Sequence, residues 1–147
     1  MLSTEPDYII AIGASAGGLE EINTFFDNTP LDGVAYVIVQ HLSADFKSRM
    51  VELLARRSKL KIEEAEEATQ VKTNHVYLIP NDKFMTIKNG KLYLTNKENI
   101  TGPHLTINKF FNSFFSMLAT NTIKVMSSKL AMLSRMELFL VIHSTNK

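Results

Sequence analysis

The feature that most constrains the fold is a strand pattern followed by a glycine-rich turn, a helix pattern and a second strand pattern. Tyr8 to Ile12 is a short apolar run ending at Gly13, as expected for a strand buried on both faces of a parallel sheet. After the turn, apolar residues recur at helical spacing from Leu19 to Phe26. Val34 to Val39 is a second apolar run, and the connection is long enough for a right-handed crossover. The sequence therefore predicts a parallel βαβ unit.

Further helix and strand patterns follow along the chain. A second helix pattern begins after Ser43-Ala44-Asp45, which suits an N-terminal cap, and residues 60–65 favour a third strand. Val76 to Ile79 is a short alternating run typical of a strand. Asn89-Gly90 separates two further alternating runs, and this dipeptide is the strongest short-range signal for a hairpin. Apolar residues from Ile107 to Leu118 have the spacing of a core helix. We therefore expect an antiparallel hairpin beside the parallel unit.

Composition excludes several classes of function. The chain has 16 basic and 15 acidic residues, so it lacks the clustered positive charge that nucleic acid or an anionic membrane attracts. It has no cysteine, and its four histidines are too far apart in sequence for a zinc box. No apolar run approaches the roughly 18 residues needed to cross a bilayer. Residues 1–7 lack the pattern of a secretory signal. We expect a cytoplasmic protein without metal, nucleic acid or membrane insertion.

The glycine-rich turn contains a candidate nucleophile. Ser15 lies in Gly13-Ala14-Ser15-Ala16-Gly17-Gly18, directly after the first strand pattern. Glycines permit a sharp turn between strand and helix, and a serine at such a turn exposes its hydroxyl above the sheet. The backbone N–H groups of Ala16 and Gly17 lie near the predicted helix N-terminus, where unpaired donors and the helix dipole stabilise an oxyanion. These two residues are the candidate oxyanion donors.

His41 is the candidate general base for Ser15. A serine hydroxyl needs a base to take its proton, and histidine titrates in the useful pH range. Each of the two residues ends one of the first two strand patterns. If those strands are neighbours in a parallel sheet, their backbones run about 4.8 Å apart and both residues lie at the carboxyl edge, where α/β sheets place their sites. Serine and histidine rotamers can bridge such a gap.

Two other interpretations fit the same residues. Gly13, Ser15 and Gly18 also suit a degraded dinucleotide fingerprint, whose glycines cradle phosphates. A dinucleotide site needs an acidic residue near the end of the second strand, where this chain has Gln40-His41. A lone histidine at a strand end is also a common structural hydrogen-bonding group. The role of His41 as a base therefore depends on the position of Ser15.

Three segments together point to a known family. They are Ile10 to Gly18 (IAIGASAGG), Gln40-His41-Leu42, and Asn74 to Pro80 followed by Asp82-Lys83. In this order they resemble the catalytic domain of the chemotaxis protein-glutamate methylesterases of the CheB type, particularly those in methylesterase–methyltransferase hybrid signalling proteins. The resemblance covers roughly residues 8 to 119.

The resemblance implies an α/β fold with a doubly wound, mostly parallel, Rossmann-like sheet. It also implies hydrolysis of glutamyl methyl esters on the cytoplasmic helices of chemotaxis receptors, often with deamidation of receptor glutamines. Ser15 matches the family's nucleophile and His41 its base, and no metal or organic cofactor is implied. The implied partners are methylated chemoreceptor-type proteins, and receiver or methyltransferase domains.

One catalytic element of that family is absent from its expected place. The third member of the triad is an aspartate in a glycine-rich segment, but this chain has no aspartate after Asp82 and no glycine after Gly102. Loss of the orienting aspartate lowers turnover about 10⁴-fold in the Ser-His-Asp triad, so we expect an impaired esterase. The alternative is a non-catalytic signalling module that keeps the fold and binds the receptor or a methyltransferase partner.

The C-terminal part is expected to differ from the family. We expect a leader at residues 1–7, an incomplete methylesterase-like domain at 8–119 and a divergent tail at 120–147. A frameshift near Thr120 would explain the tail, because one shifted frame of possible codons for Ser134 to Glu137 encodes Thr-Asp-Gly. We also expect the family's C-terminal strands to be missing, which would leave an unpaired sheet edge and favour self-association.

Overall fold

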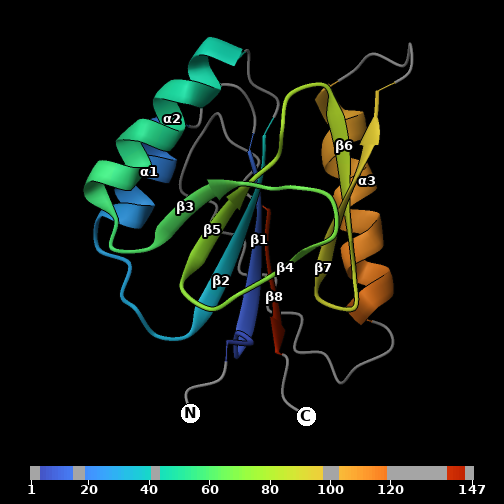
Figure 1. The fold of residues 1–147 in the computed structure, drawn as a ribbon, viewed down its shortest axis with the longest axis horizontal. Coiled ribbons are helices and arrows are strands. Elements are labelled where there is room, and N and C mark those ends of the chain that lie inside the picture. Colours follow the sequence, from blue (N-terminus) through green and yellow to red (C-terminus); the bar gives the residue numbers. More distant parts are fainter. Residues whose placement is uncertain (1–3, 15–18, 41–43, 98–102, 119–138, 145–147) are drawn as a thin grey trace.

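The chain folds into two sheets and three helices in the part that the structure describes (Figure 1). The structure is a computed structural model that describes residues 4–14, 19–40, 44–97, 103–118 and 139–144. Its elements, in chain order, are β1 (Tyr8–Ala14), α1 (Leu19–Asp27), β2 (Val34–Gln40), α2 (Ala44–Arg57), β3 (Lys61–Glu64), β4 (Thr69–Gln70), β5 (His75–Leu78), β6 (Lys83–Lys88), β7 (Lys91–Asn96), α3 (Pro103–Leu118) and β8 (Phe139–Ser144).

The larger sheet has the strand order β3-β5-β2-β1-β8. The pairs β1–β2, β2–β5 and β3–β5 are parallel, and β8 is antiparallel to β1. The βαβ unit predicted from the first two apolar runs is confirmed, with Tyr8 opposite Val34 and Ala14 opposite Gln40. The predicted third strand at residues 60–65 is β3. The mostly parallel sheet expected for this chain is therefore present.

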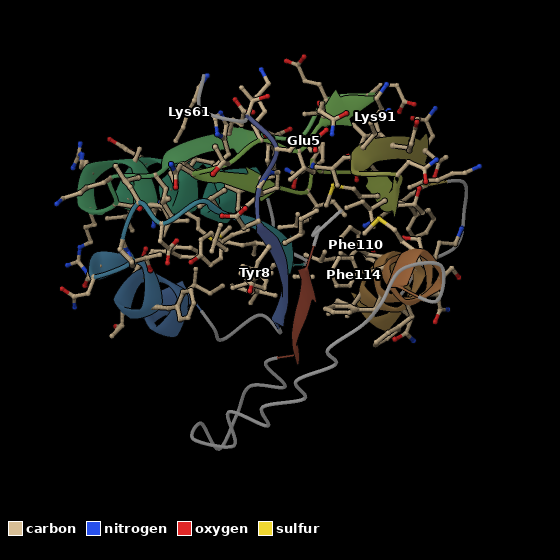
Figure 2. All side chains as sticks on the ribbon, turned by 90° about the horizontal axis from the view of Figure 1, so that it is seen from below. Glu5, Tyr8, Lys61, Lys91, Phe110 and Phe114 are labelled. Atoms are coloured by element: carbon tan, nitrogen blue, oxygen red, sulfur yellow. The ribbon has the colours of Figure 1, made fainter. Side chains whose placement is uncertain are left out.

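Helices cover both faces of this sheet, which makes the fold doubly wound (Figure 1). On one face, Ile22 and Phe26 of α1 and Met50 and Leu54 of α2 form a buried cluster with residues of β2 and β5 such as Ile38. On the other face, the buried side chains of α3 join residues of the sheet and of the hairpin. Figure 2 shows Phe110 and Phe114 at the end of this second cluster. All seven residues of β2 are buried, as a central strand between two layers requires.

The predicted hairpin is confirmed as β6 and β7, which form a three-stranded antiparallel sheet with β4. Asn89 and Gly90 connect the two strands with φ angles of 50° and 75°. Two successive positive φ angles define the turn type that matches the right-handed twist of the paired strands. The Asn-Gly dipeptide therefore sets the register in which Lys88 faces Lys91.

Two strands were not predicted from the sequence. The first is β4, which has only two residues, and the second is β8, in the tail where no clear pattern was seen. The expected unpaired edge is wrong at β1, because β8 pairs with it from Tyr8 opposite Ser144 to Gly13 opposite Phe139. The division of the chain at residue 119 stays a prediction. None of the described helices combines the length and apolarity needed to span a membrane.

Candidate functional site at the carboxyl edge of the sheet

The candidate site is defined by the ends of two neighbouring parallel strands. The last residues of β1 and β2, Ala14 and Gln40, are register partners. Ser15 and His41 are the next residues of the two chain segments. Both predicted catalytic residues, and the predicted oxyanion donors Ala16 and Gly17, lie outside the described residues. The roles assigned to these four residues stay predictions.

The end of β1 lies directly beneath α3. A Cβ atom placed on Gly13 would be 2.8 Å from Cε2 of Phe111 and 3.2 Å from Cγ2 of Ile107. Gly13 is not among the described glycines with a positive φ angle, which are Gly33 and Gly90. Its missing side chain thus allows the close approach of α3 to β1, the strand that precedes Ser15 in the chain. The sequence predicts that the glycines of this segment allow both unusual dihedrals and close approach, and at Gly13 the structure shows the close approach.

Two buried polar side chains lie near this edge, and neither is among the site residues predicted from the sequence. Gln40, the last residue of β2, is 5% exposed, and Thr106 in the first turns of α3 is 1% exposed. Thr106 is next to Ile107, which packs on Gly13, and its Oγ1 has no hydrogen-bond partner among the described residues. A polar residue four positions before the buried Phe110 is the sequence signal that could have identified Thr106.

His75 lies at the opposite edge of the sheet, because it begins β5. Its Nδ1 is 2.8 Å from the Thr73 carbonyl oxygen, and its ring stacks on Tyr77 with a centroid distance of 5.7 Å. His75 is therefore remote from the ends of β1 and β2. Among the described residues, no three His, Cys, Asp or Glu side chains lie close enough together to hold a metal ion.

Two described tyrosines have a shifted pKa, and both are parts of the core. Burial raises the pKa of Tyr36 to about 12, with a smaller contribution from the charge of Asp32. Burial likewise raises the pKa of Tyr77 to about 12; the hydrogen bond from the Lys72 N–H opposes this shift and the charge of Glu63 adds to it. Neither phenol can act as a base near neutral pH.

The fold and this strand-end arrangement define the class of protein. An open, mostly parallel sheet with helices on both faces is a doubly wound α/β fold, and its ligands bind beyond the carboxyl ends of the strands. The CheB methylesterase family model matches residues 10–130. The chain therefore belongs to the CheB methylesterase family.

Individual relatives agree with this assignment. The chain is 38% identical over 81 residues to protein-glutamate methylesterase/protein-glutamine glutaminase 1 of Xanthomonas campestris, a match that covers 55% of this chain and 23% of the relative. It is 28% identical over 130 residues to the corresponding protein of Photorhabdus laumondii, covering 86% of this chain and 37% of that protein. The chain thus spans about a quarter to two fifths of the length of these relatives.

A solved structure supports the fold. The Thermotoga maritima CheB methylesterase catalytic domain superposes with a TM-score of 0.61 and 26% sequence identity. The match covers 76% of this chain and 60% of that domain. The Rossmann-like architecture expected from the sequence is therefore confirmed.

Proposed function

We propose that this chain is a protein-glutamate methylesterase domain in which Ser15 is the nucleophile and His41 its general base. The observation that carries the proposal is the register of Ala14 opposite Gln40 at the ends of parallel neighbours. Consecutive Cα atoms are about 3.8 Å apart, so Ser15 and His41 are each tied within one residue of this pair. Paired strands are separated by about 4.8 Å, which serine and histidine side chains can span.

The proposed reaction is an acyl transfer to serine followed by hydrolysis. The imidazole of His41 takes the proton of the Ser15 hydroxyl while the oxygen attacks the ester carbonyl of a glutamyl methyl ester. The tetrahedral intermediate expels methanol, which receives the proton from the imidazolium. Water then attacks the acyl-enzyme by the same path in reverse, releasing the glutamate carboxylate and the free serine. A glutamine side chain can follow the same path, with ammonia as the leaving group.

The start of α1 supports the assignment of the oxyanion donors. Ala16 and Gly17 precede Leu19, the first residue of α1. The first N–H groups of a helix have no partner within the helix, and the helix dipole favours negative charge there. Backbone donors at this position stabilise the charge of the tetrahedral intermediate, for which one donor contributes about 10²–10³-fold in rate.

The missing triad aspartate predicts slow turnover. No aspartate follows Asp82 in the sequence, and the later acids Glu98 and Glu137 do not match the family's motif for the residue that orients the imidazole and stabilises its protonated form. The corresponding loss in the Ser-His-Asp triad is about 10⁴-fold. The oxyanion donors and substrate binding would leave a residual rate above that of the uncatalysed reaction.

The proposed substrates are methylated chemoreceptor-type signalling proteins in the cytoplasm. Support comes from the relatives described above, which are named protein-glutamate methylesterase/protein-glutamine glutaminase. Receiver and methyltransferase domains are the further partners that we propose.

An esterase assay on methylated receptor tests the proposal. Methanol release is measured for the unmodified chain, for Ser15→Ala and for Ser116→Ala, which changes an exposed serine of α3. We expect release by the unmodified chain and by Ser116→Ala, and loss of release with Ser15→Ala. Equal rates for the unmodified chain and Ser15→Ala would remove the catalytic assignment.

A second candidate function is favoured by the same missing aspartate. A chain that keeps the fold but lacks an orienting carboxylate could serve as a non-catalytic module that binds the receptor or a methyltransferase partner. This role predicts receptor binding that is unchanged by Ser15→Ala in a protein that releases no methanol.

A further inference from the structure

A groove lies between the hairpin and α3, apart from the strand ends that carry the proposed catalytic residues. Its volume is about 760 Å³, and its lining residues are Glu67, Lys83, Phe84, Leu94, Thr95, Asn96 and Lys109. Figure 1 shows β6, β7 and α3 side by side. The groove thus lies in the layer formed by α3 and the hairpin. This layer packs against the face of the main sheet opposite to α1 and α2.

The groove lies toward the carboxyl edge of the main sheet. Lys83 begins β6 and is five residues beyond Leu78, the last residue of β5. Lys109 is two residues beyond Ile107, the side chain that packs on Gly13 at the end of β1. A ligand in the groove would therefore lie on the same side of the sheet as the end of β1.

Two lysines, Lys83 and Lys109, line this groove, and a third, Lys97, lies beside it over the ring of the lining residue Phe84. Nζ of Lys109 is 4.1 Å from the centroid of the Phe84 ring, and Nζ of Lys97 is 5.5 Å from the same centroid. The ammonium of Lys83 donates a hydrogen bond to Oδ1 of Asn96 on the neighbouring strand. The aromatic ring and the amide thus hold the three lysines in place.

The positive charge is not neutralised by the described residues around it. Three ion pairs occur in the described part of the chain, and they involve Arg56, Arg57 and Lys61 rather than the groove lysines. The carboxylate in the lining, Glu67, accepts a hydrogen bond from the Leu94 N–H at 2.6 Å. Lys83 and Lys109 of the lining, with Lys97 beside them, therefore outnumber its carboxylate, and Leu94 adds a half-buried apolar side chain.

From these contacts we infer that the groove binds an acidic segment of a protein. Carboxylates of the segment pair with Lys83, Lys97 and Lys109, and an apolar side chain packs on the half-buried Leu94. The half-buried Leu94 beside the lysines favours a polypeptide, which offers apolar side chains between its carboxylates, over a nucleic acid with its continuous phosphate backbone. That this segment belongs to the esterified receptor rests on the proposed function, and it makes the groove a docking surface for the substrate.

Binding of a fluorescein-labelled, glutamate-rich helical peptide tests this inference by fluorescence anisotropy. The full chain carries Ser15→Ala, so that binding is measured without turnover. The groove variant combines K83Q, K97Q and K109Q. The matched control combines K59Q, K88Q and K91Q, which change three exposed lysines outside the groove lining and give the same net charge. Circular dichroism checks that both variants are folded.

We expect the groove variant to weaken peptide binding about tenfold and the control to change it less than about twofold. Equal losses in both variants, or no peptide binding by the parent chain, would overturn the inference. Tighter, groove-dependent binding of a single-stranded oligonucleotide or of inorganic phosphate would also overturn it. A chain that releases methanol but binds no peptide would contradict the docking surface and leave the proposed esterase intact.

Discussion

At the scale of single residues, Tyr77 joins the main sheet to the segment that precedes it. Its ring is fully buried in β5, its hydroxyl accepts a hydrogen bond from the Lys72 N–H at 2.9 Å, and it donates one to the Gln70 carbonyl at 3.3 Å. Tyr77→Phe leaves both backbone groups without this partner. We expect the free energy of unfolding to fall by about 1–3 kcal/mol, measured by urea denaturation. Tyr93→Phe, at a less buried position of β7, is the control; an equal loss there would contradict the prediction.

The raised pKa of Tyr77 predicts a loss of stability at alkaline pH. Burial raises the pKa of Tyr77 and of Tyr36 to about 12, whereas an unfolded tyrosine titrates near 10. Because the folded pKa is the higher one, the contribution to stability is complete below pH ~10 and is lost as the pH rises toward ~12. Urea denaturation at pH ~8 and pH ~11 should show this fall, and Tyr77→Phe should make it smaller. A pH dependence unchanged by the substitution would refute the assignment to Tyr77.

The candidate catalytic pair could be predicted from local patterns, but its surroundings could not. Ser15 and His41 each follow an apolar run that is long enough to be recognised as a strand. The packing of Gly13 beneath Phe111 depends on a contact between residues almost a hundred positions apart. The buried Thr106 depends on the same helix placement. Sequence periodicity says which face of a helix is buried, but not which strand end lies beneath it.

At the scale of elements, strands with a local sequence signal could be predicted, whereas strands that depend on long-range pairing could not. The hairpin was predictable because Asn89-Gly90 adopts positive φ angles at low cost and thereby selects the turn. The two residues of β4 carry no periodicity, and β4 exists because it pairs with β7. The pattern of β8 is lost in a tail rich in Met, Leu, Ser and Lys, and β8 is defined by its pairing with β1.

The contact between α3 and β6 predicts an effect of one hydroxyl group. The Ile87 N–H donates to Oγ of Ser113 at 3.0 Å, and the Ser113 hydroxyl donates to the Phe110 carbonyl at 2.7 Å. Ser113→Ala leaves the strand N–H without its acceptor, and we expect a loss of about 1–3 kcal/mol in the free energy of unfolding. Ser116→Ala changes an exposed serine of the same helix, and we expect it to stay within about 0.5 kcal/mol. Denaturant melts of the two variants compare them, and equal losses would count against the prediction.

At the scale of the whole molecule, the two edge strands of the main sheet are β3 and β8. The edge strand β3 is four residues long and contains the charged residues Lys61, Glu63 and Glu64, a composition that discourages pairing with another chain. On the other side, β8 covers the edge of β1 and is itself the edge strand. Because Ser15 directly follows β1 in the chain, β8 lies against the strand that precedes the proposed nucleophile.

The pairing of β8 with β1 predicts how removal of β8 changes the assembly state. A chain shortened by residues 139–147 would expose the N–H and C=O groups of β1 along the six positions now paired with β8. We expect this variant to dimerise or aggregate, because an unpaired strand edge is a template for pairing with another chain. Light scattering after size-exclusion chromatography measures the mass, and removal of residues 145–147 alone, which leaves β8 in place, is the control. A longer deletion that stays monodisperse and monomeric would contradict this prediction, because β1 would then resist pairing without β8.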